Sequence, residues 1–263
     1  MSSERIVVIT GASGGIGLCT AQAFIQRGDT VYSLSRSAPP DPAVRHIPTD
    51  VTDEAAVNAA ILQVQSEAGR IDVLVLNAGM GVSGAVEFTA LSEAQRQFDV
   101  CFFGAMRTMQ AALPALRQSK GMAIFVSSVA AVTPIPFQAY YSAAKAAIVS
   151  MVGALRGELN GTGVRVCAIL PGDVKTGFTQ NRRKCAVGAE VYPSLTRSVA
   201  RMEHDEQHGM APARIASAIV KTASKRRPKP YRSVGFAYRA VLVLQKLLPA
   251  RFVSFVLGKL YAS

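Results

Sequence analysis

The chain has 263 residues, of which 49% are hydrophobic, so it can bury the core of one large α/β domain. Its four cysteines are scattered and its amino terminus has no long apolar segment, which argues against a disulfide framework and a secretory signal, and we expect a cytoplasmic protein. The formal net charge of +12 arises in the last third, because residues 182–263 carry 16 Lys/Arg against four Asp/Glu.

Strand and helix patterns alternate along the first 235 residues. Short apolar runs, typical of strands covered on both faces, predict seven strands over residues 6–10, 30–35, 44–48, 72–77, 122–128, 164–170 and 230–234. Helical patterns occur between them over residues 14–27, 53–68, 92–116, 140–160 and 214–225. Single helices between strands imply parallel pairing through right-handed crossovers, so we predict an α/β fold with a doubly wound, Rossmann-like parallel sheet and helices on both faces. Ser92 and Gln95 have the spacing of a capping box at the start of the third helix.

A glycine-rich loop follows the first predicted strand and opens the first helix. It contains Gly11, Ser13, Gly15, Ile16 and Gly17. Glycines permit a tight turn and let the backbone approach a pyrophosphate, while the helix that follows offers free N–H groups to the phosphates. A glycine run alone is equally typical of an ordinary turn, but its position between a strand and a helix favours a dinucleotide site.

The second predicted strand ends at Ser35 and is followed by Arg36. A site that prefers NAD normally presents an acidic side chain here to the adenosine ribose, and Ser35 cannot supply it. The Arg36 guanidinium is suited to pair with a 2′-phosphate and to stack on adenine, with a solvated loop arginine as the ordinary alternative. We therefore predict a preference for NADP(H) over NAD(H).

A Tyr-x-x-x-Lys pair, Tyr141 and Lys145, lies in the helix predicted after the fifth strand. Residues four apart share one face of a helix, so the ammonium can favour the phenolate and lower a pKa that is ordinarily about 10. Ser128 ends the fifth strand at the edge where such sheets bind ligands, and its hydroxyl can hydrogen-bond a substrate oxygen. The pair alone is common on solvated helices, but with the glycine loop it favours acid–base catalysis.

These motifs, in this order, resemble the short-chain dehydrogenase/reductase family, in the branch with a Thr-Gly-x-x-x-Gly-x-Gly loop, over roughly residues 5–235. Residues 77–79 match the family's Asn-Ala-Gly signature, and residues 171–176 match the Pro-Gly segment that closes over the nicotinamide. The resemblance implies that Asp50 and Val51 contact adenine. The cofactor site that it implies comprises Gly11, Ser13, Gly15, Ile16, Gly17, Arg36, Asp50, Val51, Asn77, Ala78, Gly79, Tyr141, Lys145, Pro171, Gly172, Val174 and Thr176.

The same resemblance implies the catalytic roles. Ser128 orients the substrate carbonyl, Tyr141 protonates it, and Lys145 binds the nicotinamide ribose while lowering the pKa of the tyrosine. One residue departs from the pattern, because the family usually has asparagine where this chain has Cys101, and that asparagine helps to hold a water in the proton relay. A thiol is a weak hydrogen-bonding group, so we expect a slower or differently connected relay, unless Cys101 is merely a small buried residue.

Residues 173–212 correspond to the segment where this family builds its substrate lid. Apolar side chains there and in a nearby loop are candidates for a hydrophobic pocket wall, with ordinary loop packing as the alternative: Phe178, Val187, Val191, Tyr192, Leu195 and residues 134–137. We divide the chain into one dehydrogenase domain, residues 1–235, and a basic, apolar helical extension of it, residues 236–263.

Apolar and basic residues are interspersed along the extension, and Pro249 divides it into two segments. The second segment carries Phe252, Phe255, Val256 and Leu260 at helical spacing. Basic residues interrupt the extension too often for a membrane span, which needs about 20 apolar residues. Two interpretations remain. The segments are helices that pack on the core and cover the substrate entrance, or they form a surface in peripheral contact with anionic membrane, where each basic residue contributes about 1 kcal/mol.

The sequence thus predicts an NADP(H)-dependent oxidoreductase that transfers a hydride between nicotinamide and a hydrophobic, steroid- or lipid-like ketone or secondary alcohol. The substrate class follows from the lid and tail, which resemble family members that act on steroids and retinoids. One alternative is a 3-oxoacyl thioester reductase, whose basic surface would receive an acidic carrier protein. Another is a non-catalytic, cofactor-binding regulator or membrane-associated protein.

The sequence also allows predictions about the oligomeric state, nucleic-acid binding and metal binding. By resemblance we expect a homo-dimer or homo-tetramer. We expect no nucleic-acid partner, because no recognised nucleic-acid-binding motif accompanies the basic clusters. We expect no metal site, because His204 and His208 lie in a very polar stretch that is typical of a solvated helix.

Overall fold

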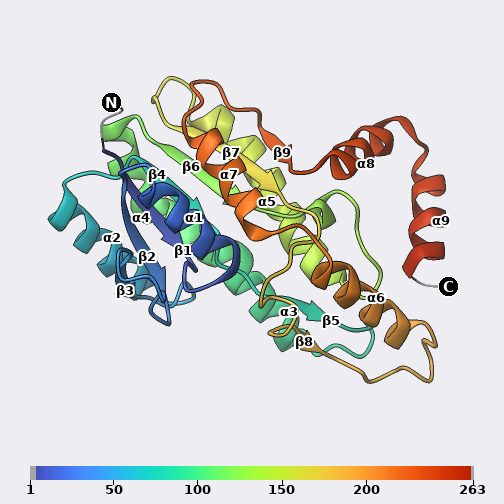
Figure 1. Cartoon of the computed structure of the whole chain (residues 1–263). Helices are drawn as coiled ribbons and strands as arrows, with labels where there is room; N and C mark the ends of the chain where they lie inside the picture. Colours follow the sequence, from blue (N-terminus) through green and yellow to red (C-terminus); the bar gives the residue numbers. More distant parts are fainter. Residues whose placement is uncertain (1–3, 262–263) are drawn as a thin grey trace.

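A seven-stranded parallel sheet forms the centre of the molecule in the computed structural model, which describes residues 4–261 (Figure 1). The strand order is β3-β2-β1-β4-β6-β7-β9. All seven predicted strands are present, with ends that shift by a few residues: β1 Ile6–Thr10, β2 Thr30–Ser35, β3 Arg45–Pro48, β4 Val73–Leu76, β6 Met122–Val126, β7 Arg165–Leu170 and β9 Tyr231–Ser233. The predicted doubly wound, Rossmann-like fold is therefore confirmed.

Helices cover both faces of the sheet, because successive strand residues point to opposite sides. Val8 points to one face, where it joins a core cluster with Ile61 and Leu116. Its neighbour Val7 points to the other face, in a cluster with Ile219. The helices that pack on the sheet are α1 Gly15–Ile25, α2 Glu54–Ala68, α4 Gly104–Ser119, α5 Ala139–Glu158 and α7 Pro212–Ala223.

The helix predicted over residues 92–116 forms with a different start. It begins as α3 (Leu91–Phe98), with Ala90 as its N-cap in an extended conformation. Ser92 already lies inside the first turn and makes no cap hydrogen bond, so the predicted capping box is wrong. The N-cap lies two residues earlier than the Ser92/Gln95 pattern indicates, because Ala90 is the last residue with an extended backbone before the helix.

A π-helical turn, Asp99–Phe103, separates α3 from α4. The wider turn holds an extra residue, and such turns occur often at functional sites. Cys101 lies in the middle of this turn and is buried. The position at which the chain departs from the family pattern is therefore also the position at which the helix departs from regular geometry.

Two short strands and a helix lie outside the main sheet. β5 (Val82–Ser83) pairs in parallel with β8 (Arg183–Lys184), and α6 (Leu195–Gln207) follows. Strands this short leave no periodic pattern, so the sequence does not predict them. The exposed rings of His204 and His208 stack with their centres 4.2 Å apart. Between residues 4 and 261, no three His, Cys, Asp or Glu side chains are grouped as metal ligands would be.

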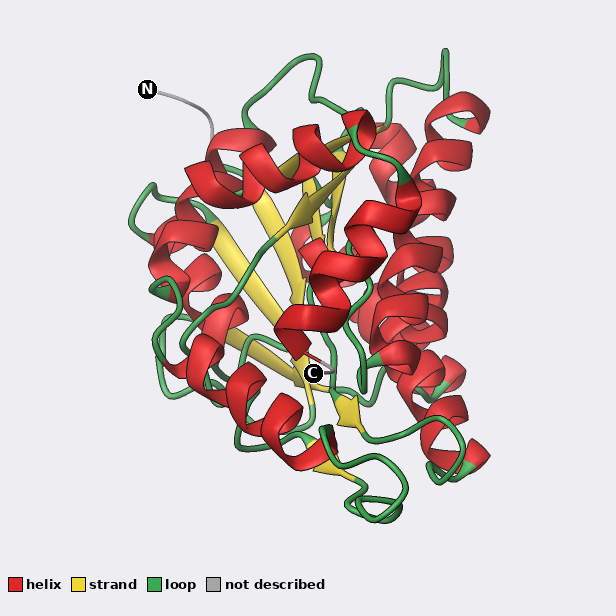
Figure 2. Ribbon diagram, turned by 90° about the vertical axis from the view of Figure 1, so that its right-hand side faces the viewer, coloured by secondary structure: helices red, strands yellow, loops and turns green. Residues whose placement is uncertain are grey.

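The carboxyl-terminal extension forms two helices, α8 (Phe236–Leu247) and α9 (Ala250–Tyr261), divided near Pro249 as predicted. Both lie at one side of the molecule, with α9 beside α6 (Figure 1). Figure 2, which turns this side toward the viewer, shows the last helix in front of the sheet, ending at the label C. None of the helices in the described part of the chain has both the length and the hydropathy of a membrane span.

Candidate active site

A large cavity, of about 1870 Å³, opens at the carboxyl ends of the parallel strands. It lies where the strand order reverses between β1 and β4, which is where doubly wound sheets bind their ligands. Sites for a single small ligand usually occupy about 300–1,000 Å³, so this cavity has room for a large cofactor together with a substrate. Every residue of the predicted cofactor and catalytic sets lines it except Gly17.

The glycine loop after β1 adopts backbone conformations that favour glycine. Gly11 and Gly15 have φ angles of +69° and +54°, in the left-handed region. Gly17 is buried in α1, where a Cβ would lie 2.3 Å from the carbonyl oxygen of Gly11, so its role is to let the helix pack closely on the loop. The first N–H groups of α1 have no intrahelical partner, and they offer donors and the positive end of the helix dipole to a phosphate.

Thr10 and Asn77 fix this loop against β4. Thr10 Oγ1 accepts hydrogen bonds from the backbone N–H groups of Asn77 and Ala78, at 2.9 and 3.0 Å. In return, Asn77 Nδ2 donates to the carbonyl oxygens of Thr10 and Gly11, at 3.1 and 3.0 Å. The Asn-Ala-Gly signature therefore shapes the cavity by holding the glycine loop in place.

Charged groups gather at the end of the cavity where the resemblance implies the adenosine. Arg36 is exposed at the end of β2, and Asp50 follows β3 next to the buried Val51. Burial by itself raises the pKa of Asp50, but hydrogen bonds from the Thr52 backbone N–H (3.0 Å) and hydroxyl (2.8 Å), with the charges of Arg36 and Arg96, bring it below its ordinary value. Arg96 of α3 is a second guanidinium lining the cavity here, and no sequence motif singles it out.

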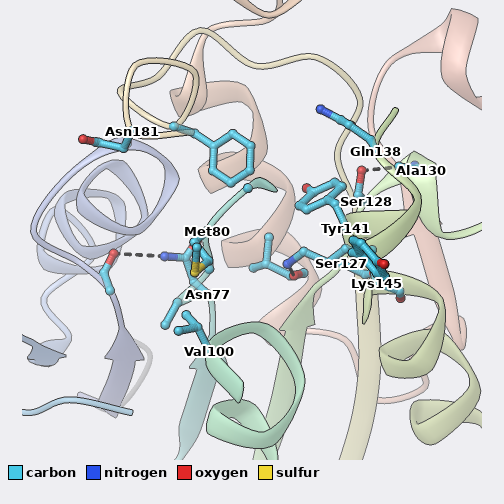
Figure 3. Close-up of a pocket in the computed structure, with 18 of the residues that line it drawn as sticks. Asn77, Met80, Val100, Ser127, Ser128, Ala130, Gln138, Tyr141, Lys145 and Asn181 are labelled. Atoms are coloured by element: carbon cyan, nitrogen blue, oxygen red, sulfur yellow. Dashed lines mark hydrogen bonds between the residues drawn. The ribbon is translucent and has the colours of Figure 1, made fainter. Parts of the chain in front are cut away.

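Ser128, Tyr141 and Lys145 meet at the other end of the cavity, where β6 ends and α5 begins (Figure 3). Ser128 Oγ accepts a hydrogen bond from the Ala130 N–H at 3.1 Å, which orients the side chain and leaves its hydroxyl proton available. Lys145 Nζ donates to the Val126 carbonyl oxygen at 2.9 Å and lies 5.8 Å from the centre of the Tyr141 ring. A hydroxyl, a phenol and an ammonium group thus share one corner, which is the set needed to bind and protonate a carbonyl oxygen.

Burial changes the acidity of both titratable groups in this corner. Desolvation raises the pKa of Tyr141 above its ordinary value, and the adjacent Ser128 hydroxyl opposes only part of the effect. Desolvation lowers the pKa of Lys145, because its ammonium is buried. Desolvation thus acts against the lowering by Lys145 that the resemblance implies, and that lowering stays a prediction. A phenol with a raised pKa is protonated at neutral pH, as a proton donor must be.

Cys101 reaches the same corner from the π-helical turn. A Cβ placed on Gly79 would lie 3.7 Å from Cys101 Sγ and 3.6 Å from Lys145 Nζ, so both groups lie near one point. Gln97, one turn earlier and fully buried, donates through Nε2 to Cys101 Sγ at 3.0 Å and to the Met80 carbonyl oxygen at 2.8 Å. Its Oε1 is buried without a hydrogen-bond partner among the described residues. Gln97 thus places an amide beside the thiol. No sequence pattern indicates this role, because glutamine on a helix is usually a surface residue.

The segment after β7 closes the cavity and is held by the tail. Thr176 packs on the glycine loop, where a Cβ at Gly15 would lie 3.3 Å from the Thr176 Cβ. Tyr238 of α8 lies so close to Gly172 that a Cβ there would be 2.1 Å from the tyrosine Cζ. The Tyr238 phenol donates to Asp173 Oδ2 at 2.6 Å and accepts from the Asp173 N–H at 3.0 Å. Tyr238 is therefore part of the site, although no motif identifies it.

Apolar side chains wall the catalytic end, but most of them are not the predicted ones. Phe178 lines the cavity beside Tyr141, with ring centres 5.6 Å apart, and Ile135 also lines it. The prediction is wrong for four residues of the lid segment, because β8 and contacts with the loop after β5 hold this part of the chain away from the cavity: Val187, Val191, Tyr192 and Leu195. Of the predicted residues 134–137, Pro134, Pro136 and Phe137 do not line the cavity either. The wall is completed by the tail, through Tyr238, Val241, Leu257, Leu260 and Tyr261.

The residues present fit a nicotinamide dinucleotide. The glycine loop and the N-terminus of α1 suit a pyrophosphate, because the backbone there is open to close approach. Two guanidinium groups and a carboxylate stand at one end, and the acid–base corner stands at the other. The apolar wall beside that corner leaves space for a hydrophobic substrate.

Comparison with known proteins agrees with this geometry. The model of the short chain dehydrogenase family matches residues 5–186. A 3-ketodihydrosphingosine reductase of Bacteroides thetaiotaomicron is 36% identical over 265 residues, which cover 98% of each chain. The structure of a short-chain dehydrogenase from Streptomyces avermitilis aligns with a TM-score of 0.81 and 28% identity, over 93% of this chain and 94% of its own. Another from Burkholderia cenocepacia, solved in complex with NADP, aligns with a TM-score of 0.75 and 25% identity, over 99% and 98%.

Proposed function

We propose that this chain, which belongs to the short-chain dehydrogenase/reductase family and is an oxidoreductase acting on CH–OH or C=O groups, reduces a long-chain lipid ketone with NADPH. The observation that carries the proposal is the apolar wall that α8 and α9 add to the catalytic end of the cavity. A 3-keto sphingoid base is the favoured substrate, because the similarity to the Bacteroides reductase includes these tail helices as well as the motifs.

In this proposal the side chains of the acid–base corner act on the ketone oxygen. Bound NADPH supplies the hydride to the carbonyl carbon. Ser128 donates a hydrogen bond to the oxygen, and Tyr141 transfers its phenolic proton to it, so that C=O becomes CH–OH. Lys145 then stabilises the phenolate, because its ammonium lies 5.8 Å from the ring centre in a site with little water. Solvent reprotonates the tyrosine after turnover.

The choice of NADPH over NADH rests on the adenosine end of the cavity. Ser35 ends β2 where an NAD site would present a carboxylate, and Arg36 beside it lines the cavity. Arg96 of α3 is a second positively charged side chain that lines the cavity. A 2′-phosphate would be bound by charge-assisted hydrogen bonds that the 2′-hydroxyl of NADH cannot form as strongly.

Assembly and location stay predictions. We propose a homo-dimer or homo-tetramer in the cytoplasm, with the anionic membrane as a peripheral partner of the tail. The alternative 3-oxoacyl thioester reductase is less well supported, because the tail helices line the catalytic end of the cavity with apolar side chains.

The proposal is tested by following nicotinamide absorbance with both NADPH and NADH. The substrates offered are 3-ketodihydrosphingosine, a ketosteroid and a 3-oxoacyl thioester. We expect the sphingoid ketone and NADPH to give the highest kcat/KM, and Tyr141→Phe to lower kcat by about 10²–10⁴-fold, the usual contribution of an acid–base group. Tyr140→Phe is the matched control, because it removes a phenol from the adjacent position on the same helix. No turnover by an NADPH-binding preparation on any of the three would contradict the proposal.

A further inference from the structure

The tail helices present large apolar side chains to the outside of the molecule. On α8, Phe236 is 85% exposed and Leu247 is 75% exposed, and on α9 Phe255 is 61% exposed. Their spacing gathers them along one side of each helix. We name this set the tail apolar face, and it comprises Phe236, Val243, Leu244, Leu247, Phe252, Phe255 and Val256. Soluble proteins rarely leave a group of this kind uncovered, so it indicates a partner.

The charge on these helices is of one sign. After Glu206 the chain contains no Asp or Glu, so every charged side chain of α7, α8 and α9 is basic. Arg239 and Arg251 are exposed on the two tail helices. A second copy of the chain seated on this face would bring like charges together, whereas an anionic lipid surface attracts each basic residue. Apolar side chains flanked by Arg and Lys are typical of helices that lie in the plane of a membrane surface.

The same two helices reach the cavity. Tyr238 of α8 and Leu257 of α9 line it. Val241 and Leu260 line it as well, and they remain 38% and 42% exposed, so they stand at its opening. Apolar side chains therefore lead from the tail apolar face to the catalytic end.

α8 is anchored on its inner side, which leaves the outer side available. Gln245 accepts a hydrogen bond from Thr133 Oγ1 at 3.0 Å and donates to the Val132 carbonyl oxygen at 2.5 Å. Tyr238 is hydrogen-bonded to Asp173 near the start of the same helix. These contacts hold the helix on the domain, so contact with a lipid surface does not require it to detach.

We propose that the tail apolar face docks the protein on an anionic lipid bilayer, and that the lipid ketone passes from that bilayer into the cavity beside Val241 and Leu260. The second part rests on the proposed function, whereas the docking does not depend on catalysis. The physical reason is the alkyl chain of the lipid, because exposing each of its CH₂ groups to water on the way to a soluble enzyme is unfavourable. A cavity that opens at the bilayer surface avoids that step.

Docking is tested by flotation with vesicles of phosphatidylcholine, with and without phosphatidylglycerol. The tail variant combines Phe236→Ser, Leu247→Ser and Phe255→Ser. The control variant combines Leu62→Ser, Val86→Ser and Val187→Ser, which are 64%, 55% and 62% exposed outside the tail. We expect the wild type and the control to float with anionic vesicles, more at low salt than at high salt. The tail variant should lose at least about tenfold in partitioning, while its circular dichroism and NADPH binding are unchanged.

Substrate entry is tested by kinetics on the same three proteins. We expect the tail variant to lose about tenfold in kcat/KM when 3-ketodihydrosphingosine is presented in anionic vesicles, and to match the wild type when it is presented in detergent micelles. An equal loss in both media would overturn entry from the bilayer. Absence of wild-type flotation, or an equal loss in the control variant, would overturn docking. A wild-type oligomer that the tail variant converts to a monomer, without vesicle binding, would assign the face to a second copy instead. An inactive protein that still floats would refute the proposed function but leave the docking intact.

Discussion

The phenol of Tyr238 donates a 2.6 Å hydrogen bond to Oδ2 of Asp173, although the two residues lie 65 positions apart in the chain. This contact joins the first tail helix to the segment that closes the cofactor cavity. Asp173 is a half-buried carboxyl whose pKa is raised by desolvation, with the Tyr238 hydrogen bond acting in the opposite direction. The first tail helix is therefore held by hydrogen bonds to the segment that closes the cofactor cavity.

Tyr238→Phe keeps the ring but removes the hydroxyl, and we expect it to loosen α8. The carboxyl and the N–H of Asp173 each lose a partner, and a hydrogen bond to a charged group contributes about 1.5–3 kcal/mol. Amide hydrogen exchange in α8 should accelerate by about tenfold or more. Tyr140→Phe is the control, because the Tyr140 hydroxyl lies 3.5 Å from its acceptor. Equal exchange rates in both variants would show that Asp173 does not hold the helix.

Gly172→Ala should lower activity because Tyr238 leaves no room for a methyl group. The new Cβ would lie 2.1 Å from the Tyr238 ring, so either the ring or the loop must move. We expect KM for NADPH to rise by about tenfold or more, since overpacking typically destabilises by about 1–3 kcal/mol. Gly172→Ala combined with Tyr238→Ala should recover part of the loss. Additive effects in this double-mutant cycle would place the defect elsewhere.

Arg36→Ala should change the choice between the two cofactors. Losing a charge-assisted contact to a 2′-phosphate should lower kcat/KM with NADPH by about 10–100-fold and leave NADH nearly unaffected. Arg27→Ala is the control, because Arg27 is exposed and does not line the cofactor cavity. An equal fall in kcat/KM with NADPH and with NADH would show that Arg36 does not recognise the 2′-phosphate.

Cys101→Ala should slow turnover, because it removes the acceptor shared by Gln97 Nε2 and the Met80 N–H, at 3.0 and 3.4 Å. The Met80 N–H would lose this acceptor and Gln97 Nε2 would keep only the Met80 carbonyl oxygen, which should lower stability by about 1 kcal/mol or more and disturb the corner around Lys145. We expect kcat to fall several-fold with KM little changed, and Cys101→Asn to restore it by supplying an acceptor. Cys167→Ala is the control, because Cys167 is equally buried in β7. Equal kcat values for the two alanine variants would make Cys101 a simple packing residue.

Lys145→Met should abolish activity and alter the pH dependence of stability. Burial lowers the pKa of Lys145 below its ordinary value of 10.5, so the unfolded chain binds the proton more tightly than the folded protein. Its contribution to stability is therefore present above pH 10.5 and is lost as the pH falls through the folded pKa. We expect the stability of the variant relative to the wild type to rise as the pH is lowered from 10.5, in denaturant titrations at several pH values. Lys175→Met is the exposed control, and curves for Lys145→Met that run parallel to those of the wild type would contradict the desolvation.

The sequence by itself determined the sheet and most of the cavity lining. Seven apolar runs and the helices between them dictate parallel pairing, and parallel strands bring their carboxyl ends to one edge. Gly11, Asn77, Ser128 and Pro171 each follow a strand, so their meeting in one cavity is a consequence of topology. Tyr141 and Lys145 are adjacent because one helical turn separates them.

The tertiary structure alone decided what depends on distant parts of the chain. Desolvation of Tyr141 and Lys145 is a property of everything packed around them, and it raises the pKa of the tyrosine and lowers that of the lysine. The pairing of Gln97 with Cys101 required the π-helical turn, which no periodicity reveals. Tyr238 lies on Gly172 only because α8 folds back across the end of β7. Local sequence patterns predict helices, strands and turns. Which side chains are buried away from water depends on packing between segments that are far apart in the sequence.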